Sequence, residues 1–264
     1  MTTTELLPLT IEAALKAGKR IMEIYENEDF EVDFKSDNSP LTKADIASHK
    51  IIESYLIQTG IPVLSEEGNE IEYKDRKDWR RLWIVDPIDG TKEFINKNGE
   101  FTVNIALIED QKPVLGVIYV PALNDLYYST INDGAFKLAG ISQLKPFEEI
   151  HAAAIKLPNV DSERPYTVVA SRSHLSQKTK DFVKKLEETH GQINFISKGS
   201  SLKLCMIAEG AADCYPRFAP TMEWDTAAGH AICNHAGYSV IDWETQEEMK
   251  YNREQLLNNS FLVK

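Results

Sequence analysis

The chain has 264 residues, of which 42% are hydrophobic, 27% charged and 9% aromatic, an ordinary composition for a soluble globular protein. This length suits one large domain or two small ones, with enough apolar side chains for a substantial core. The formal net charge of -12 argues against binding to a nucleic-acid polymer, because such proteins are usually basic where they contact phosphate.

The sequence indicates a reduced, cytoplasmic protein. It begins MTTTE, without a basic and then apolar leader, and no stretch approaches the roughly 18 apolar residues that a membrane span needs. Cys205, Cys214 and Cys233 are too few and too scattered for a disulfide framework or a zinc site, and are expected to pack as small apolar residues. Peripheral association with a membrane and the oligomeric state are left open.

Helical and strand patterns alternate along the first half of the chain. Apolar residues recur at helical spacing over 7–25 and over 42–56, which predicts two amphipathic helices. Short apolar runs at 61–64 and 82–85 predict strands. The β-branched runs at 101–108 and 114–120 predict a hairpin, and 127–129 continues the sheet.

The signals weaken between residues 141 and 164, and this predicts a boundary between subdomains at 1–142 and 143–264. The second half predicts strands at 166–170 and 238–242, and helices at 177–189, 202–208 and 226–236. Because helices and strands are mixed in both halves, the sequence predicts a layered α/β (α+β) sandwich.

Candidate metal ligands lie where the predicted strand at 82–85 ends. The chain continues there as Asp86-Pro87-Ile88-Asp89-Gly90-Thr91. The proline biases the residue before it towards extended geometry, and the glycine permits a close ligand approach. Two carboxylates three positions apart on a tight turn can face one point, which suits a hard cation. An ordinary Asx-type turn is the alternative for this segment alone.

Two further acidic features favour a metal site. Glu66 and Glu67 follow the predicted strand at 61–64, so at least one of these carboxylates lies on a strand-end loop. Asp225 stands at the start of the Ala-rich helix at 226–236. The alternatives are a solvated pair of glutamates and a helix N-cap at Asp225.

These acidic segments together resemble the signatures of the inositol monophosphatase superfamily, a family of lithium-sensitive, magnesium-dependent phosphatases. The segments are Glu66-Glu67, the run at 86–91, and Trp224-Asp225-Thr226-Ala227-Ala228-Gly229, in the right order over nearly the whole chain. The resemblance implies the layered sandwich of this family, in which antiparallel and mixed sheets alternate with helix layers. The active site would then lie between the two halves.

Three more segments resemble one branch of that family, the CysQ-type 3'(2'),5'-bisphosphate nucleotidases. They are Asp89-Gly90-Thr91-Lys92-Glu93-Phe94, the run at 98–107, and Gly199-Ser200-Ser201-Leu202-Lys203. This branch takes the 3'-phosphate from adenosine 3',5'-bisphosphate (PAP), giving AMP, and so recycles a by-product of sulfate assimilation. Whether the 3'-phosphosulfate form (PAPS) is also a good substrate is left open.

The resemblance implies two or three magnesium ions. Glu66, Asp86 and the backbone carbonyl of Ile88 would hold one ion. Asp86 would bridge to a second ion, which Asp89 and Asp225 would complete. Magnesium suits an all-oxygen set, and no His or Cys stands at matching spacing for zinc.

The remaining catalytic roles also follow from the resemblance. Glu67 would lie in the outer shell of a third, weaker ion. Asp45 and Thr91 would orient and deprotonate the attacking water, and the phosphate would lie against the N–H groups of Gly90 and Thr91. Direct attack by water, with no phosphoenzyme, is the mechanistic hypothesis.

Substrate preference would come from groups farther out. His174 and Lys203 match residues that contact AMP in the nucleotidases. The helix N-terminus after Gly199 and Ser200, with Lys203 nearby, is a candidate site for the second phosphate. Arg217 is a candidate bidentate partner of a phosphate or the base.

Two other functions stay open. A phosphatase of inositol or sugar monophosphates is the nearest, although Lys92, His174 and Lys203 favour a substrate with a second phosphate. Lys92 has the alternative of pairing with Glu93. A non-catalytic sensor of nucleotide or metal is the other, and nothing in the sequence favours it.

Overall fold

The computed structural model describes residues 1–27, 32–34, 40–161, 163–171 and 176–264. Its largest element is a seven-stranded sheet in the order β3-β4-β5-β6-β7-β8-β9. β3 and β4 are parallel, and the other neighbours are antiparallel. The strands are β3 (Val63–Ser65), β4 (Arg81–Asp89), β5 (Thr102–Glu109), β6 (Lys112–Val120), β7 (Asp125–Thr130), β8 (Gly134–Leu138) and β9 (Ile155–Leu157).

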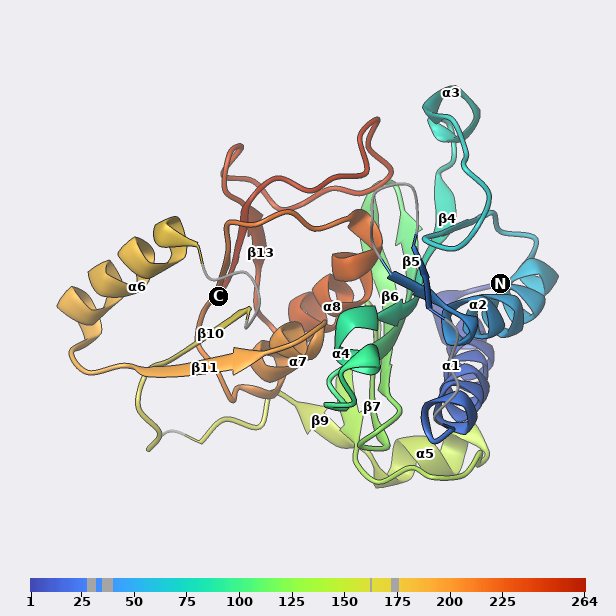
Figure 1. Cartoon of the computed structure of the whole chain (residues 1–264), viewed down its shortest axis with the longest axis horizontal. Coiled ribbons are helices and arrows are strands. Elements are labelled where there is room, and N and C mark those ends of the chain that lie inside the picture. The colour runs from blue at the N-terminus through green and yellow to red at the C-terminus, as the bar shows by residue number, and fades with distance from the viewer. Residues whose placement is uncertain (28–31, 35–39, 162, 172–175) are drawn as a thin grey trace.

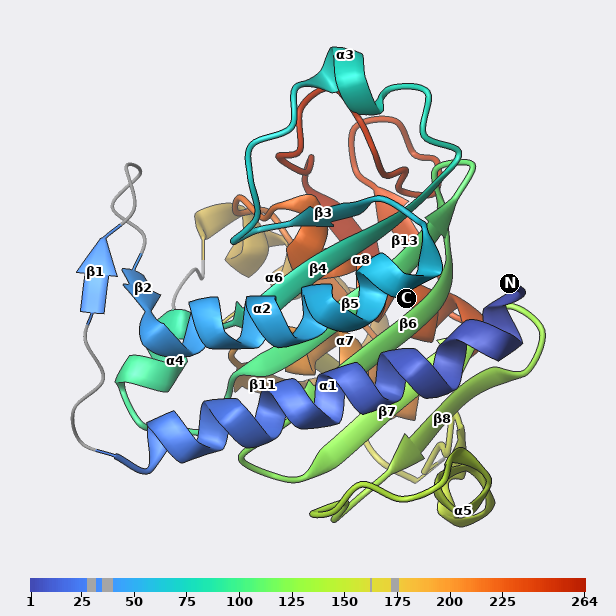
Figure 2. The ribbon, with the colours of Figure 1, turned by 90° about the vertical axis from the view of Figure 1, so that its right-hand side faces the viewer.

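Helices cover both faces of this sheet (Figures 1 and 2). α1 (Thr3–Tyr25) and α2 (Lys43–Leu56) lie on one face, and α7 (Leu202–Glu209) and α8 (Glu223–His235) on the other. Trp83 and Val85 of β4 belong to the core beneath α1 and α2, whereas Leu82 and Ile84 belong to the core beneath α7 and α8. Because alternate residues of a strand point to opposite faces, a strand covered on both sides reads as one continuous apolar run.

Smaller sheets complete the second half of the chain. β10 (Thr167–Ser171) pairs in parallel with β11 (Asn194–Lys198) after the intervening α6 (Gln177–His190). β14 (Phe261–Val263) pairs with both β12 (Tyr215–Arg217) and β13 (Val240–Asp242). The remaining elements are β1 (Val32–Phe34), β2 (Pro40–Thr42), η1 (Ile57–Thr59), α3 (Tyr73–Arg76), α4 (Thr91–Ile95) and α5 (Phe147–Ala153).

The predicted layered sandwich of helices and mixed sheets is confirmed. The 141–164 stretch, where the sequence signals weaken, holds α5 and β9, and β9 pairs with β8 to extend the main sheet. The division into subdomains at 1–142 and 143–264 stays a prediction. No helix within the described ranges is both long enough and apolar enough to cross a bilayer.

Gly116 of β6 sets how closely α8 packs on the sheet. A Cβ at this position would lie 2.5 Å from the carbonyl oxygen of Ala228 and 2.8 Å from the Cβ of Ala231, both on α8. Packed interiors do not absorb such overlaps without moving backbone. We expect Gly116→Ala to lower the free energy of unfolding by about 1–3 kcal/mol in urea titrations. Ordinary surface substitutions change the free energy of unfolding by less than about 0.5 kcal/mol. A change this small in Gly116→Ala would contradict the close packing of α8 on β6.

Candidate active site

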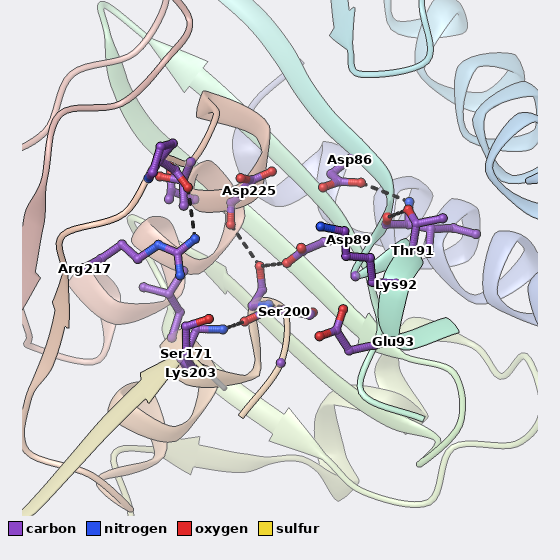
Figure 3. A pocket seen from close by; sticks show the side chains of 18 of the residues that line it. Asp86, Asp89, Thr91, Lys92, Glu93, Ser171, Ser200, Lys203, Arg217 and Asp225 are labelled. Carbon is purple, nitrogen blue, oxygen red and sulfur yellow. Dashed lines mark hydrogen bonds between the residues drawn. The ribbon is translucent and has the colours of Figure 1, made fainter. Parts of the chain in front are cut away.

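A cavity of about 280 Å³ lies between the end of β4 and the start of α8 (Figure 3). It gathers side chains from segments that are far apart in the sequence. Most of the residues predicted for the site line it, namely Glu66, Asp86, Ile88, Asp89, Gly90, Thr91, Lys92, Gly199, Ser200, Lys203, Arg217 and Asp225. Glu67 is half-buried outside that lining, and the predicted AMP contact His174 lies outside the described residues.

Three carboxylates meet at one point of this cavity. Asp86 and Asp89 come from the end of β4 and Asp225 from the first turn of α8, and each has an oxygen within 4.8 Å of the other two. Asp86 is fully buried, with 1% exposure, and its Oδ1 accepts the N–H of Ile88 at 3.0 Å. The predicted convergence of these three side chains is therefore present in the fold.

The start of α8 differs from its predicted position. The helix begins at Glu223, three residues before the predicted start, and Met222 is its N-cap. The alternative role of Asp225 as N-cap is therefore wrong. Asp225 lies in the first turn, where its Oδ2 accepts the N–H of Met222 at 2.9 Å and the helix dipole favours a negative charge.

The buried carboxylates of the cluster require either protons or a bound cation. Burial, followed by the charges of Glu66, Asp89 and Asp225, raises the pKa of Asp86 well above its ordinary value. Burial, and then Asp89, likewise raise the pKa of Asp225. Like charges this close either take up protons or are neutralised by a cation. The three carboxylates offer oxygen ligands, a donor set that fits a hard divalent ion such as Mg²⁺.

These raised pKa values predict that stabilisation by Mg²⁺ grows with pH. Between the unfolded and folded pKa values of Asp86 and Asp225, the metal-free folded state binds more protons than the unfolded state, so its stability falls as the pH rises. Bound cation removes that loss, because the ligands are then deprotonated. We expect a saturating Mg²⁺ concentration to raise Tm by roughly 5–10 °C at pH 8 and by less at pH 6. An equal increase in Tm at pH 6 and pH 8 would contradict the binding of Mg²⁺ to carboxylates with raised pKa values.

Thr91 and Asp45 form the predicted pair beside the carboxylates. Thr91 is the first residue of α4, and its Oγ1 donates to Asp45 Oδ1 at 3.2 Å. Asp45 is 1% exposed in the first turn of α2, and its Oδ2 accepts the N–H of Thr42 at 2.7 Å. The predicted tight turn at 86–91, after a strand ending at 85, is therefore wrong in its bounds. β4 continues to Asp89 with a register shift between Asp86 and Asp89, and Gly90, at φ 93°, leads into the short helix α4.

The cations on the opposite wall are held by backbone oxygens. Lys203 is 5% exposed, and its ammonium donates to the carbonyls of Lys198 and Ser200. Burial lowers the pKa of Lys203 to about 8. Arg217, 8% exposed, donates from Nε to the Ala219 carbonyl at 3.1 Å and from a terminal nitrogen to the Pro220 carbonyl at 2.9 Å. Both cations border the cavity, whereas Lys92 is exposed at its rim.

Sequence reasoning missed the polar groups behind Asp89. The Asp89 Oδ2 accepts the hydroxyl of Ser201 at 2.8 Å, and Asn104 and Thr102 of β5 lie next to it. A signal for them exists, because Thr102 and Asn104 are polar residues at spacing two, on one face of an otherwise apolar strand.

Comparison with known proteins identifies this arrangement. The model of the inositol monophosphatase family matches residues 3–263. The chain belongs to the inositol monophosphatase family. A Shigella flexneri protein named 3'(2'),5'-bisphosphate nucleotidase CysQ is 45% identical over 98% of this chain and 99% of its own length. A Buchnera aphidicola protein of the same name is 41% identical over 97% and 92%.

A solved structure agrees with these relatives. The crystal structure of CysQ from Bacteroides thetaiotaomicron, described as a bacterial member of the inositol monophosphatase family, has a TM-score of 0.91 and 48% identity, and the match covers 100% of this chain and 98% of that one. The predicted resemblance to this family and its CysQ-type branch is confirmed, and so is the fold that it implies.

Proposed function

We propose that this chain is a Mg²⁺-dependent phosphatase that hydrolyses the 3'-phosphate of PAP and releases AMP and inorganic phosphate. The observation that carries the proposal is the meeting of Asp86, Asp89 and Asp225 at one point of a cavity walled on its far side by Lys203 and Arg217. Identity of 45% with a bisphosphate nucleotidase over almost the full length supports this substrate class. PAPS is a second candidate substrate with the same 3'-phosphate.

The carboxylates would hold two ions, and Glu67 would lie near a third. Glu66, Asp86 and the Ile88 carbonyl would bind one ion, and Asp86, Asp89 and Asp225 the other. Bound Mg²⁺ would neutralise the dianionic phosphate and lower the pKa of the attacking water. The members of this ligand set come from the residue after β3, from β4 and from α8, and these three elements contribute residues to one hydrophobic core.

Thr91 and Asp45 would take the proton from the attacking water. The Thr91 hydroxyl donates its hydrogen towards Asp45, so its lone pairs are available to accept a proton from water in the cavity. As Thr91 gained that proton, it would pass its own to Asp45. A proton acceptor placed this way typically contributes 10²- to 10⁴-fold to the rate, an order-of-magnitude figure.

Backbone and cationic groups would bind the substrate anions. The scissile phosphate would lie against the N–H groups of Gly90 and Thr91, since the first N–H groups of a helix have no partner within it. Lys203 and Arg217, with Gly199, Ser200 and His174, would face the second phosphate and the nucleoside. Lithium sensitivity, a place in recycling the by-product of sulfate assimilation and a cytoplasmic location belong to the same proposal.

Product analysis tests the proposal. Incubation of PAP with protein and Mg²⁺ should give 5'-AMP and one equivalent of phosphate by chromatography, and EDTA should stop the reaction. Formation of adenosine 3'-phosphate would show hydrolysis at the wrong ester and contradict the proposal. Unchanged turnover in EDTA would contradict the role given to the carboxylates.

A further inference from the structure

A buried polar network lies between Asp89 and the loop before α7. Thr102 and Asn104 of β5 are 0% and 1% exposed, and Ser201 is 2% exposed. The Thr102 hydroxyl contacts Ser200 Oγ at 2.8 Å and Asn104 Oδ1 at 2.9 Å. Asn104 Nδ2 lies 2.9 Å from Ser201 Oγ and 3.5 Å from Asp89 Oδ2. Figure 3 labels Asp89 and Ser200 among the residues that line the cavity.

The chemistry of Asp89 fixes the direction of these hydrogen bonds. The Asp89 carboxylate and the Asp225 carbonyl oxygen only accept, so the one hydroxyl hydrogen of Ser201 goes to one of them. Ser201 must then accept from Asn104, and the side of Asn104 that lies 2.9 Å from Ser201 Oγ is its amide nitrogen. The carbonyl oxygen of Asn104 then faces Thr102, and Thr102 must donate to it. Because Thr102 has one hydroxyl hydrogen, the bond between Thr102 and Ser200 requires Ser200 to be the donor.

Ser201 adds a second link to the same carboxylate. Its hydroxyl lies 2.8 Å from Asp89 Oδ2 and 2.9 Å from the backbone carbonyl oxygen of Asp225, so it joins ligands from β4 and α8. Ser200, next to it, has φ 49°, a left-handed conformation that costs a non-glycine residue about 1 kcal/mol or more. Such a conformation persists only where surrounding contacts stabilise it, and the hydrogen bonds of Ser200 are contacts of this kind.

We propose that Thr102, Asn104, Ser200 and Ser201 are positioning residues that hold the Asp89 carboxylate in its ligand geometry. Hydrogen bonds run in one direction, from Ser200 through Thr102, Asn104 and Ser201 to Asp89. The hydroxyl hydrogen of Ser200 therefore points to Thr102, and any hydrogen bond that Ser200 donates to substrate comes from its backbone. This inference rests on the proposed function, because it assigns Asp89 to a cation.

Thr102→Val tests the network with little change in shape. The variant cannot donate to Asn104, so the amide is free to turn and Asp89 loses its fixed partner. We expect Mg²⁺ affinity, measured by calorimetric titration without substrate, to fall about 10- to 100-fold, as for outer-shell partners of metal ligands. At saturating Mg²⁺, KM for PAP should stay near the wild-type value. Thr102→Ser keeps the hydroxyl and should bind Mg²⁺ like wild type.

A matched control separates positioning from stability. Thr130 of β7 lies in the same sheet, is 0% exposed, and donates to Asp133 Oδ2 at 2.6 Å, away from the cavity. Thr130→Val should lower Tm without changing Mg²⁺ affinity. If Thr102→Val also lowered only Tm and bound Mg²⁺ like wild type, the inference would be overturned. A wild type that bound no Mg²⁺ would overturn the proposed function as well.

Ser200→Ala gives an independent test if Thr102→Val does not fold. The inference predicts that Ser200→Ala binds Mg²⁺ about tenfold more weakly than wild type. Unchanged Mg²⁺ affinity with a raised KM would show that the Ser200 hydroxyl binds substrate. That result would overturn the inference and leave the proposed function standing.

Discussion

Asp89→Asn should reduce Mg²⁺-dependent phosphate release from PAP by more than about 100-fold. Mutation of an outer-shell partner of a metal ligand typically costs about 10- to 100-fold, and mutation of the ligand itself should cost more. The amide keeps the size of the carboxylate but removes one negative charge from the site where Asp86, Asp89 and Asp225 meet. It also places a hydrogen-bond donor where a cation would bind. Initial rates at several Mg²⁺ concentrations measure the effect.

A distant aspartate provides the control for this variant. Asp110 is exposed and pairs with Arg80 at 2.8 Å, so Asp110→Asn removes the same charge from the whole protein without touching the cavity. It should keep wild-type turnover. If Asp89→Asn kept more than a tenth of the wild-type kcat/KM, Asp89 would not be a metal ligand in this enzyme.

Thr91→Val should lower kcat by roughly 10²- to 10⁴-fold, the usual contribution of a positioned proton acceptor. Valine has the shape of threonine but offers no oxygen to accept a proton from water or to pass one to Asp45. Mg²⁺ affinity should change little, because the proposed ligands are other residues. Single-turnover rates together with Mg²⁺ titrations distinguish the two effects.

Thr91→Ser is the matched variant, because it keeps the hydroxyl bonded to Asp45. We expect its kcat to stay within about tenfold of wild type, a smaller loss than the one caused by removing the acceptor. Equal losses in the serine and valine variants would show that packing of the methyl group, and not proton transfer, accounts for the change.

The local parts of this fold could be predicted from the sequence because their signals are local. The apolar run that precedes Asp86 predicted β4, and the helical periodicity predicted α1 and α2 close to their observed bounds. Short strands such as β9 and β11 were missed, since each is exposed or only half-buried over most of its length and so lacks a strong apolar pattern. Their pairing depends on neighbours far along the chain.

Distant contacts also explain the two differences at the site. Glu223, the first residue of α8, is buried, and its carboxylate accepts the N–H groups of Asn252 and Arg253, about thirty residues later. No local pattern shows this partner. Asn104 and Ser201 are 97 residues apart, and only the packing of β5 against the loop before α7 brings them together behind Asp89.

The choice of substrate is the central claim, and a comparison of kcat/KM for two substrates tests it. PAP and inositol 1-phosphate share a scissile monoester, but only PAP has a second phosphate to face Lys203 and Arg217. The measurement is kcat/KM for each at pH 7, below the pKa of about 8 at Lys203, where its ammonium is charged. We predict a preference for PAP of at least about 100-fold, equal to about 2.7 kcal/mol in the transition state. An equal or greater kcat/KM for inositol 1-phosphate would contradict the substrate assignment and leave only the metal site in place.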